Sequence, residues 1–247
     1  FYDLKGWNYA KHIFDIDVEI VPNVEAKCID VTMSKFGEGD ILYTLDGSDP
    51  LANGTKYTEA LKLTENAKLR AIVKRAKSVG KEFKTDIELS KSSMKPITLK
   101  NEPHENYRFD GANTLIDGLS GGKNYKTGRW IAFFKNDMEA VIDLKNPTEV
   151  SSVSINTLVE KGDWVFDARR IAVYVSEDGE NFTEVASQDY PVLTLDNPNQ
   201  IYEHKLTFDA VTTKYLKVYL QPEHSLPDWH GSKGHPSFVF LDEIVVN

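Results

Sequence analysis

The sequence is short of cysteine, of helical periodicity and of long apolar runs. Its 247 residues contain a single cysteine, Cys28, so an intrachain disulfide and a cysteine zinc cluster are both excluded. No apolar run approaches the roughly 20 residues that a membrane-spanning helix requires, and we therefore expect no membrane insertion. The chain begins at Phe1 without a basic start and an apolar core, so we expect no signal peptide and interpret it as a processed piece of a longer protein.

Positive charge is also in deficit. Lysine and arginine number 29 against 38 aspartates and glutamates, which gives a net charge of −9. Nucleic acids and anionic membranes both demand basic patches, so neither is an expected partner. The deficit is uneven, because residues 1–93 carry a net charge of −1 and residues 94–247 a net charge of −8. Simple solubility explains such acidity; a cation site that draws on a few of the carboxylates is the alternative.

Most enzyme signatures are missing. There is no Walker-type glycine loop, no dinucleotide fingerprint and no His-Glu-x-x-His zinc motif. Residues 118–122 match the letters of the nucleophile elbow, but that motif needs a strand before its serine and a helix after it. We predict a loop over residues 117–128 instead. Since no pair of carboxylates stands out for acid–base work, we predict no catalytic residue and no hydrolase activity in this chain.

What the sequence does contain is short alternating runs rich in Val, Ile, Thr, Tyr and Phe, which are typical of half-buried strands. Trp130 begins such a run and is predicted to lie in the core. Because the polar stretch Ser90–Ser93 separates two series of runs, we predict two domains, residues 1–93 and residues 94–247, of which the first is a small β-sandwich. The first series is 12–21, 27–33, 41–45, 68–75 and 82–89, and the second is 95–100, 140–144, 150–158, 170–176, 201–208, 215–221 and 238–246.

Two loops, residues 160–166 and 222–236, place a tryptophan among polar side chains. An exposed loop tryptophan calls for a functional reason. The apolar C–H face of a sugar ring stacks on an indole, while its hydroxyls bond to neighbouring carboxylates and imidazoles. The alternative is that both tryptophans cap the ends of the sandwich core. The candidate ligand-binding residues are Asp163, Trp164, Asp228, Trp229 and His230.

A first resemblance to a known family lies within residues 41–73. The segment Ile41–Pro50, followed by Tyr57 and Lys68–Val73, resembles the immunoglobulin-like chitobiase/β-hexosaminidase C-terminal domain. The segment reads as a hairpin, in which a strand ends in an Asp-Gly turn and a proline then stops further strand pairing. The opening segment Gly6–Asp15 looks like the stretch that joins that module to the catalytic barrel in family 20 glycoside hydrolases of Bacteroidetes.

The second series of runs resembles the coagulation-factor five/eight type C fold, also called discoidin-like or family 32 carbohydrate-binding. Together the two resemblances imply an all-β chain, in which an immunoglobulin/fibronectin-III-like sandwich precedes a galactose-binding-like jelly roll. The matching segments, in the order of the family, are 115–118, Trp130, 140–144, 150–153, 171–182, 214–218 and 242–246.

Members of the second family often hold one structural calcium ion. The resemblance implies Asp117 and Glu243 as ligands here, with backbone carbonyls of Thr114, Leu119 and Asp242 completing the shell. Hard oxygen ligands of this kind suit Ca²⁺. The insert of residues 119–129 departs from the family, which has a short loop with a further ligand at this place. The alternative is that Asp117 only caps a turn and Glu243 is a solvated strand residue.

The resemblances imply the non-catalytic C-terminal region of a secreted, periplasmic or outer-surface bacterial β-N-acetylhexosaminidase, or chitobiase. Its partners would be a glycan that ends in galactose, N-acetylgalactosamine or N-acetylglucosamine, and the catalytic domain of the parent enzyme. The rival hypothesis is a structural or protein-interaction module that packs against the catalytic barrel without binding sugar, because this fold hosts binders of several kinds. A free-standing adhesin is a third interpretation.

Overall fold

A computed structural model describes residues 16–247. These residues form two compact units, one that ends at Glu88 and one that spans Leu89–Asn247, called unit 1 and unit 2 below. The predicted boundary followed Ser93, five residues later. The backbone of Lys91 donates to Val246 and the Ser92 hydroxyl donates to the Ile244 carbonyl, so this polar stretch is part of unit 2. The segment 6–15, which carried the resemblance to a barrel linker, lies outside the described residues.

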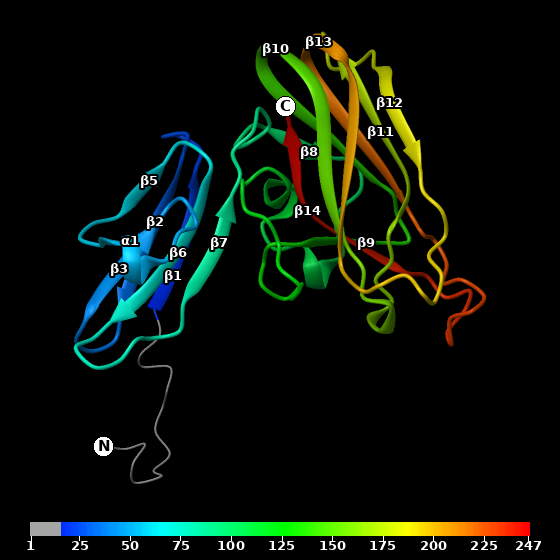
Figure 1. Cartoon of the computed structure of the whole chain (residues 1–247). Coiled ribbons are helices and arrows are strands. Elements are labelled where there is room, and N and C mark those ends of the chain that lie inside the picture. Colours follow the sequence, from blue (N-terminus) through cyan, green and yellow to red (C-terminus); the bar gives the residue numbers. More distant parts are fainter. Residues whose placement is uncertain (1–15) are drawn as a thin grey trace. The chain divides into compact units, whose positions relative to one another are not determined.

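Unit 1 is built from two small antiparallel sheets, with strand orders β1-β2-β5 and β4-β3-β6-β7 (Figure 1). Every second residue along β2 and β6 is buried, which is the alternation that the sequence showed, and Ile29, Val31 and Leu69 are fully enclosed. The elements of unit 1 are β1 (Ile16–Asn23), β2 (Cys28–Lys35), β3 (Asp40–Thr44), α1 (Pro50–Asn53), β4 (Thr55–Lys56), β5 (Leu61–Leu63), β6 (Ala67–Lys74) and β7 (Phe83–Ile87).

Unit 2 is a larger antiparallel sheet of strand order β12-β11-β13-β10-β14-β9, with β8 paired to β10. Three short 3₁₀ turns, η2 to η4, lie between the strands. The elements of unit 2 are β8 (Ile97–Leu99), η2 (Glu105–Tyr107), η3 (Gly111–Leu115), β9 (Ile131–Phe134), β10 (Met138–Leu158), η4 (Lys161–Asp163), β11 (Ala168–Ser176), β12 (Thr183–Asp189), β13 (Ile201–Pro222) and β14 (Phe238–Val246).

Two long strands, β10 and β13, organise unit 2. They pair with each other from end to end, through register shifts between Asp143 and Thr148 and between Val150 and Ser152; Figure 1 shows them side by side along the unit. The first part of β10 also pairs with β8 and the second part with β14. The sheet therefore wraps around one apolar core, which includes Ile142, Val153 and Leu216.

The structure confirms the predicted all-β class and the burial of Trp130, which is 0% exposed. It differs in the strand count. Residues 140–144 and 150–158 are parts of one strand, as are 201–208 and 215–221, because the register shifts absorb the interrupting residues without ending the pairing. No helix within residues 16–247 is long and apolar enough to cross a membrane.

Candidate functional site

Three short segments of unit 2 converge on a buried acidic cluster. η3 contributes Thr114, the turn that follows it contributes Asp117 and Leu119, and β14 contributes Asp242 and Glu243. Leu119 donates its backbone N–H to Asp117 Oδ1 at 2.8 Å. This bond closes the Asp-Gly turn and holds one carboxylate oxygen in place.

Glu243 is the unusual member of this cluster. Its side chain is 1% exposed, and neither carboxylate oxygen accepts a hydrogen bond of ordinary geometry from any residue in 16–247. The Thr114 hydroxyl is equally enclosed and unpartnered within that range. Buried polar atoms are almost always paired, so these three oxygens make the cluster a candidate site for a ligand.

Burial and mutual repulsion raise the pKa values of two carboxylates in the cluster. Burial raises the pKa of Asp117 to about 7, although the Arg129 guanidinium opposes the shift. Burial, followed by the charge of Asp117, raises the pKa of Glu243 well above its ordinary value, although the backbone N–H groups of Gly118 and Asp117 oppose the rise. Each of these buried carboxylates disfavours the ionisation of the other, and a bound cation would offset that repulsion.

The Asp242 carboxylate is already occupied. It accepts the backbone N–H of Gly121 at 2.9 Å, the Asn156 amide at 3.2 Å and the backbone N–H of Glu243 at 2.5 Å. Only its carbonyl is available as a ligand, in the role that the resemblance implied. Residues 16–247 hold no group of three or more His, Cys, Asp or Glu side chains placed to bind a metal, so hydroxyl and carbonyl oxygens would complete a shell around two carboxylates.

The insert of residues 119–129 is fastened at several points. Gly121 lies against the face of Trp130, where a Cβ atom would come within 2.2 Å of the indole. The Trp130 indole N–H donates to the Gly122 carbonyl at 2.9 Å. Farther along, the Tyr125 hydroxyl donates to Asp163 Oδ2 at 2.8 Å. The insert therefore runs from the acidic cluster to the first of the predicted ligand loops.

In this first loop, Asp163 is exposed and ends η4, and Trp164 is half-buried in a left-handed conformation with φ of 64°. The Trp164 ring lies 5.5 Å from the imidazole of His235. The backbone carbonyl of Trp164 accepts the backbone N–H of Phe238 at 2.8 Å. The left-handed turn therefore joins the first predicted ligand loop to the end of the second and to the start of β14.

In the second predicted loop, Trp229 and His230 are half-buried and Asp228 is exposed. The Trp229 indole N–H donates to the Leu193 carbonyl at 2.8 Å, and the Lys161 ammonium lies 5.7 Å from the ring centre. His230 Nε2 lies 3.1 Å from the Lys161 carbonyl. The two loops therefore meet through Lys161, and the polar atom of the Trp229 ring is engaged within the protein.

A buried polar network supports both loops. Asp167 Oδ1 accepts the Thr157 hydroxyl at 2.5 Å and lies 2.7 Å from His204 Nε2. All three side chains are buried. The Asp167 carbonyl accepts the backbone N–H of Glu223 at the start of the second loop. Since Asp167 directly follows the first loop, this network anchors the base of both.

An aromatic surface next to Asp163 was not predicted. We define it as the half-buried rings His104, Tyr107, Tyr125, Phe134 and Phe238. Phe134 and Phe238 stack at 4.5 Å between centroids, and the His104 and Tyr107 rings meet Phe238 edge-on at 5.1 Å and 5.8 Å. The Lys135 ammonium lies 5.1 Å from the Phe134 centroid. These rings come from four separate segments of sequence, so no local pattern could have grouped them.

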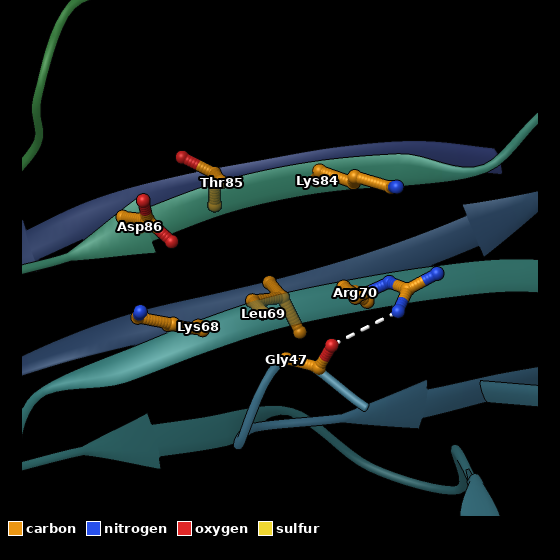
Figure 2. A pocket seen from close by; sticks show the side chains of 7 residues that line it. All are labelled: Gly47, Lys68, Leu69, Arg70, Lys84, Thr85 and Asp86. Atoms are coloured by element: carbon orange, nitrogen blue, oxygen red, sulfur yellow. Dashed lines mark hydrogen bonds between the residues drawn. The ribbon is translucent and has the colours of Figure 1, made fainter. Parts of the chain in front are cut away.

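Unit 1 has a pocket of its own, of about 360 Å³, between β6, β7 and the turn at Gly47. Figure 2 shows its lining side chains, with cations on both strands. Arg70 donates to the Gly47 carbonyl at 2.9 Å and to Glu82 Oε1 at 2.5 Å, and Lys84 pairs with Glu82 at 2.9 Å. These two cations are already satisfied within the unit, and we assign no ligand to the pocket.

Comparison with solved structures gives matches of low identity. Chitosan-binding module 1 from the chitosanase/glucanase of Paenibacillus sp. IK-5 is 19% identical, with 64% of this chain and 98% of that one covered and a TM-score of 0.42. CpGH89CBM32-5 from Clostridium perfringens, in complex with GalNAc-β-1,3-galactose, is 16% identical over 61% and 93% of the two chains, with a TM-score of 0.40. The lectin domain of lectinolysin complexed with Lewis B antigen is 15% identical over 64% and 95%, with a TM-score of 0.42.

Family models give the firmer assignment. No protein of curated function matches the chain significantly. The "Fn3 associated" model matches residues 29–85, within unit 1. The F5/8 type C domain model matches residues 90–238, which is more than half of the chain. The chain therefore belongs to the F5/8 type C domain family.

Proposed function

We propose that unit 2 is a non-catalytic carbohydrate-binding module whose ligand lies on the aromatic surface beside Asp163. The observation that carries this proposal is the group of half-buried rings, among them Tyr107 and Phe238, next to an exposed carboxylate. Such rings offer a stacking face for the C–H side of a pyranose. Since the Tyr125 hydroxyl donates its hydrogen to Asp163 Oδ2, the second oxygen of Asp163 and the Tyr125 hydroxyl oxygen offer acceptors for the sugar hydroxyls.

The remaining predicted ligand residues flank this surface. Trp164 is joined through its backbone to Phe238 while its ring lies beside His235, so it would border the surface on the side of the first loop. Asp228, Trp229 and His230 form the neighbouring second loop, which Lys161 connects to the first. Because the indole N–H of Trp229 is engaged with Leu193, Trp229 would contribute its ring edge and face to a longer glycan, and Asp228 a free carboxylate.

We also propose that the acidic cluster holds a structural Ca²⁺ ion. The orphaned oxygens of Glu243 and Thr114 and the second oxygen of Asp117 fit a hard, oxygen-preferring cation. The carbonyls of Thr114, Leu119 and Asp242 would complete the shell. The bound ion would supply the positive charge that these buried carboxylates lack. The residues themselves would hold the turn after η3 against β14, at the root of the insert that carries Tyr125.

In its biological setting we propose that the chain is the C-terminal region of an extracellular or periplasmic bacterial β-N-acetylhexosaminidase. Unit 1 would act as a spacer or docking surface for the catalytic barrel, and unit 2 would bind terminal galactose, N-acetylgalactosamine or N-acetylglucosamine. A single module of this kind binds weakly, with a Kd on the order of 0.1–1 mM, or about 4–5.5 kcal/mol. Its benefit would be a raised local concentration of enzyme at the glycan.

The test is an NMR titration of the full chain with each of the three sugars, in the presence of calcium. We expect saturable shifts in residues 160–166 and on the aromatic surface, and a loss of affinity of at least about tenfold in Asp163→Ala, because a charge-assisted hydrogen bond to the ligand would be removed. The matched control is Tyr174→Phe on β11, which also lies in unit 2 and is expected to bind as the wild type does.

Silence with all three sugars up to tens of millimolar would contradict sugar binding, and would favour the module that only packs against its catalytic domain. The same protein should release no nitrophenol from an aryl N-acetylglucosaminide. Release that is lost in a Ser120→Ala or Asp163→Asn variant would contradict the non-catalytic assignment.

A further inference from the structure

A positive charge stands beside the acidic cluster. Arg129 ends the insert, and its Nη1 lies 3.9 Å from Asp117 Oδ2. The separation is too long for a hydrogen bond but short enough for a strong charge interaction, because the two side chains are only 27% and 13% exposed. Burial lowers the pKa of Arg129, and the charge of the Asp117 carboxylate opposes this shift.

This guanidinium has two opposite effects. In the metal-free protein it offsets part of the repulsion between Asp117 and the unpaired carboxylate of Glu243. When a divalent cation is bound between those carboxylates, the guanidinium and the cation are neighbours of the same sign. Like charges a few ångströms apart in a partly buried place repel strongly, since the effective dielectric constant is about 20 rather than 80.

We propose that Arg129 is a built-in counter-cation that lowers the affinity of this site for calcium while it stabilises the metal-free form. Calcium must then displace the guanidinium towards solvent or bind against its charge. The site would bind calcium more weakly than its two buried carboxylates alone would allow, and so it would respond to the calcium concentration rather than hold the ion permanently. This inference rests on the calcium site proposed above.

The test compares Arg129→Gln with the wild type in the full chain. Calcium affinity is measured by competition with a chelator, starting from calcium-loaded protein, because the variant is expected to lose stability without metal. Arg129→Gln should bind calcium at least about tenfold more tightly and melt at a lower temperature in EDTA. Arg129→Lys keeps the charge and should remain within a few-fold of the wild type.

Lys123→Gln is the matched control. It removes the same charge from an exposed position in the same insert, and should change the calcium affinity less than about twofold, since exposed charges are well screened. Arg129→Met, which keeps the apolar stem of the side chain, replaces Arg129→Gln if that variant does not fold even with calcium.

The outcomes separate the two proposals. If the wild type binds calcium and Arg129→Gln binds it equally or more weakly, the role of Arg129 is refuted and the calcium site stands. If neither protein binds calcium, both proposals fall together. If only Arg129→Gln binds calcium, the guanidinium excludes the ion altogether, which supports the inference in its strongest form.

Discussion

The Glu243→Gln substitution removes an ionisable carboxyl group at a position where the residue is 1% exposed and neither oxygen accepts a hydrogen bond of ordinary geometry from residues 16–247. The shape of the side chain is kept, so the packing between β14 and the turn after η3 is unchanged. What changes is the charge that faces Asp117. The substitution therefore separates the electrostatic cost of the cluster from its packing.

The expected effect without metal is stabilisation. An uncompensated buried charge costs about 3–5 kcal/mol, and keeping the carboxyl protonated at neutral pH, as its raised pKa favours, costs a similar amount because the unfolded pKa is about 4.3. The partly unsatisfied amide that replaces it costs about 1–3 kcal/mol. The difference predicts a gain of about 1–3 kcal/mol in the free energy of unfolding of unit 2. For a domain of this size each kcal/mol moves Tm by about 2–4 °C, so the gain is roughly 2–12 °C.

With calcium the expectation reverses. A ligand that binds only the folded state at 100 times its Kd stabilises that state by about 2.7 kcal/mol, which corresponds to roughly 5–11 °C for the wild type. Glu243→Gln lacks one of two carboxylate ligands and should gain almost nothing. Glu243→Gln should therefore melt above the wild type in EDTA, but not in calcium.

Tryptophan fluorescence is the suitable assay, because Trp130, Trp164 and Trp229 all lie in unit 2. Glu203→Gln, at an exposed position of β13, is the control and should melt like the wild type in both conditions. If Glu243→Gln melted below the wild type in EDTA, the carboxylate would have a favourable partner in the metal-free protein. The argument from its orphaned oxygens would then be refuted.

Three further expectations concern unit 2. Gly121→Ala should lower its stability by about 1–3 kcal/mol, because the new Cβ would lie 2.2 Å from the Trp130 indole; an unchanged Tm would contradict this contact. Thr157→Val should cost about 1–3 kcal/mol, measured by urea unfolding, because buried Asp167 loses a donor at 2.5 Å. A loss below about 0.5 kcal/mol would show that the network is not a support. The carboxylate of Asp178 accepts bonds from Asn181 and its neighbours, which lower its pKa. A lowered folded pKa adds stability above the unfolded value of about 3.9 that is lost as the pH falls further. The wild type should therefore exceed Asp178→Asn in Tm at pH 7, with the gap closing below about pH 4. A gap that stays constant down to pH 2 would contradict the assignment.

The sequence predicted the local features well because they depend on near neighbours. The alternation along β2 or β11 is a property of the strand itself. Where a strand is interrupted, the prediction from local sequence was wrong about where the strand ends. The stretch around Lys145 resembles a turn, and Lys145 indeed has a φ of 72°, but pairing with β13 resumes beyond it.

The candidate ligand site shows the same division. The tryptophans of the two loops could be singled out from their polar neighbours, but the aromatic surface combines residues from η2, the insert, β9 and β14, which only the folded sheet brings together. The sequence also could not show that Lys161 joins the two loops or that Leu193 engages the indole of Trp229.

By itself the sequence determined that this protein is all-β, that it contains two sandwiches, and that Asp117 and Glu243 are candidate cation ligands. Only the tertiary structure decided that Glu243 is buried without a partner and that Arg129 stands 3.9 Å from Asp117. The physical reason is that strand alternation and turns arise from contacts within a few residues, whereas burial and the balance of charges are set by segments more than 100 residues apart that meet on β14.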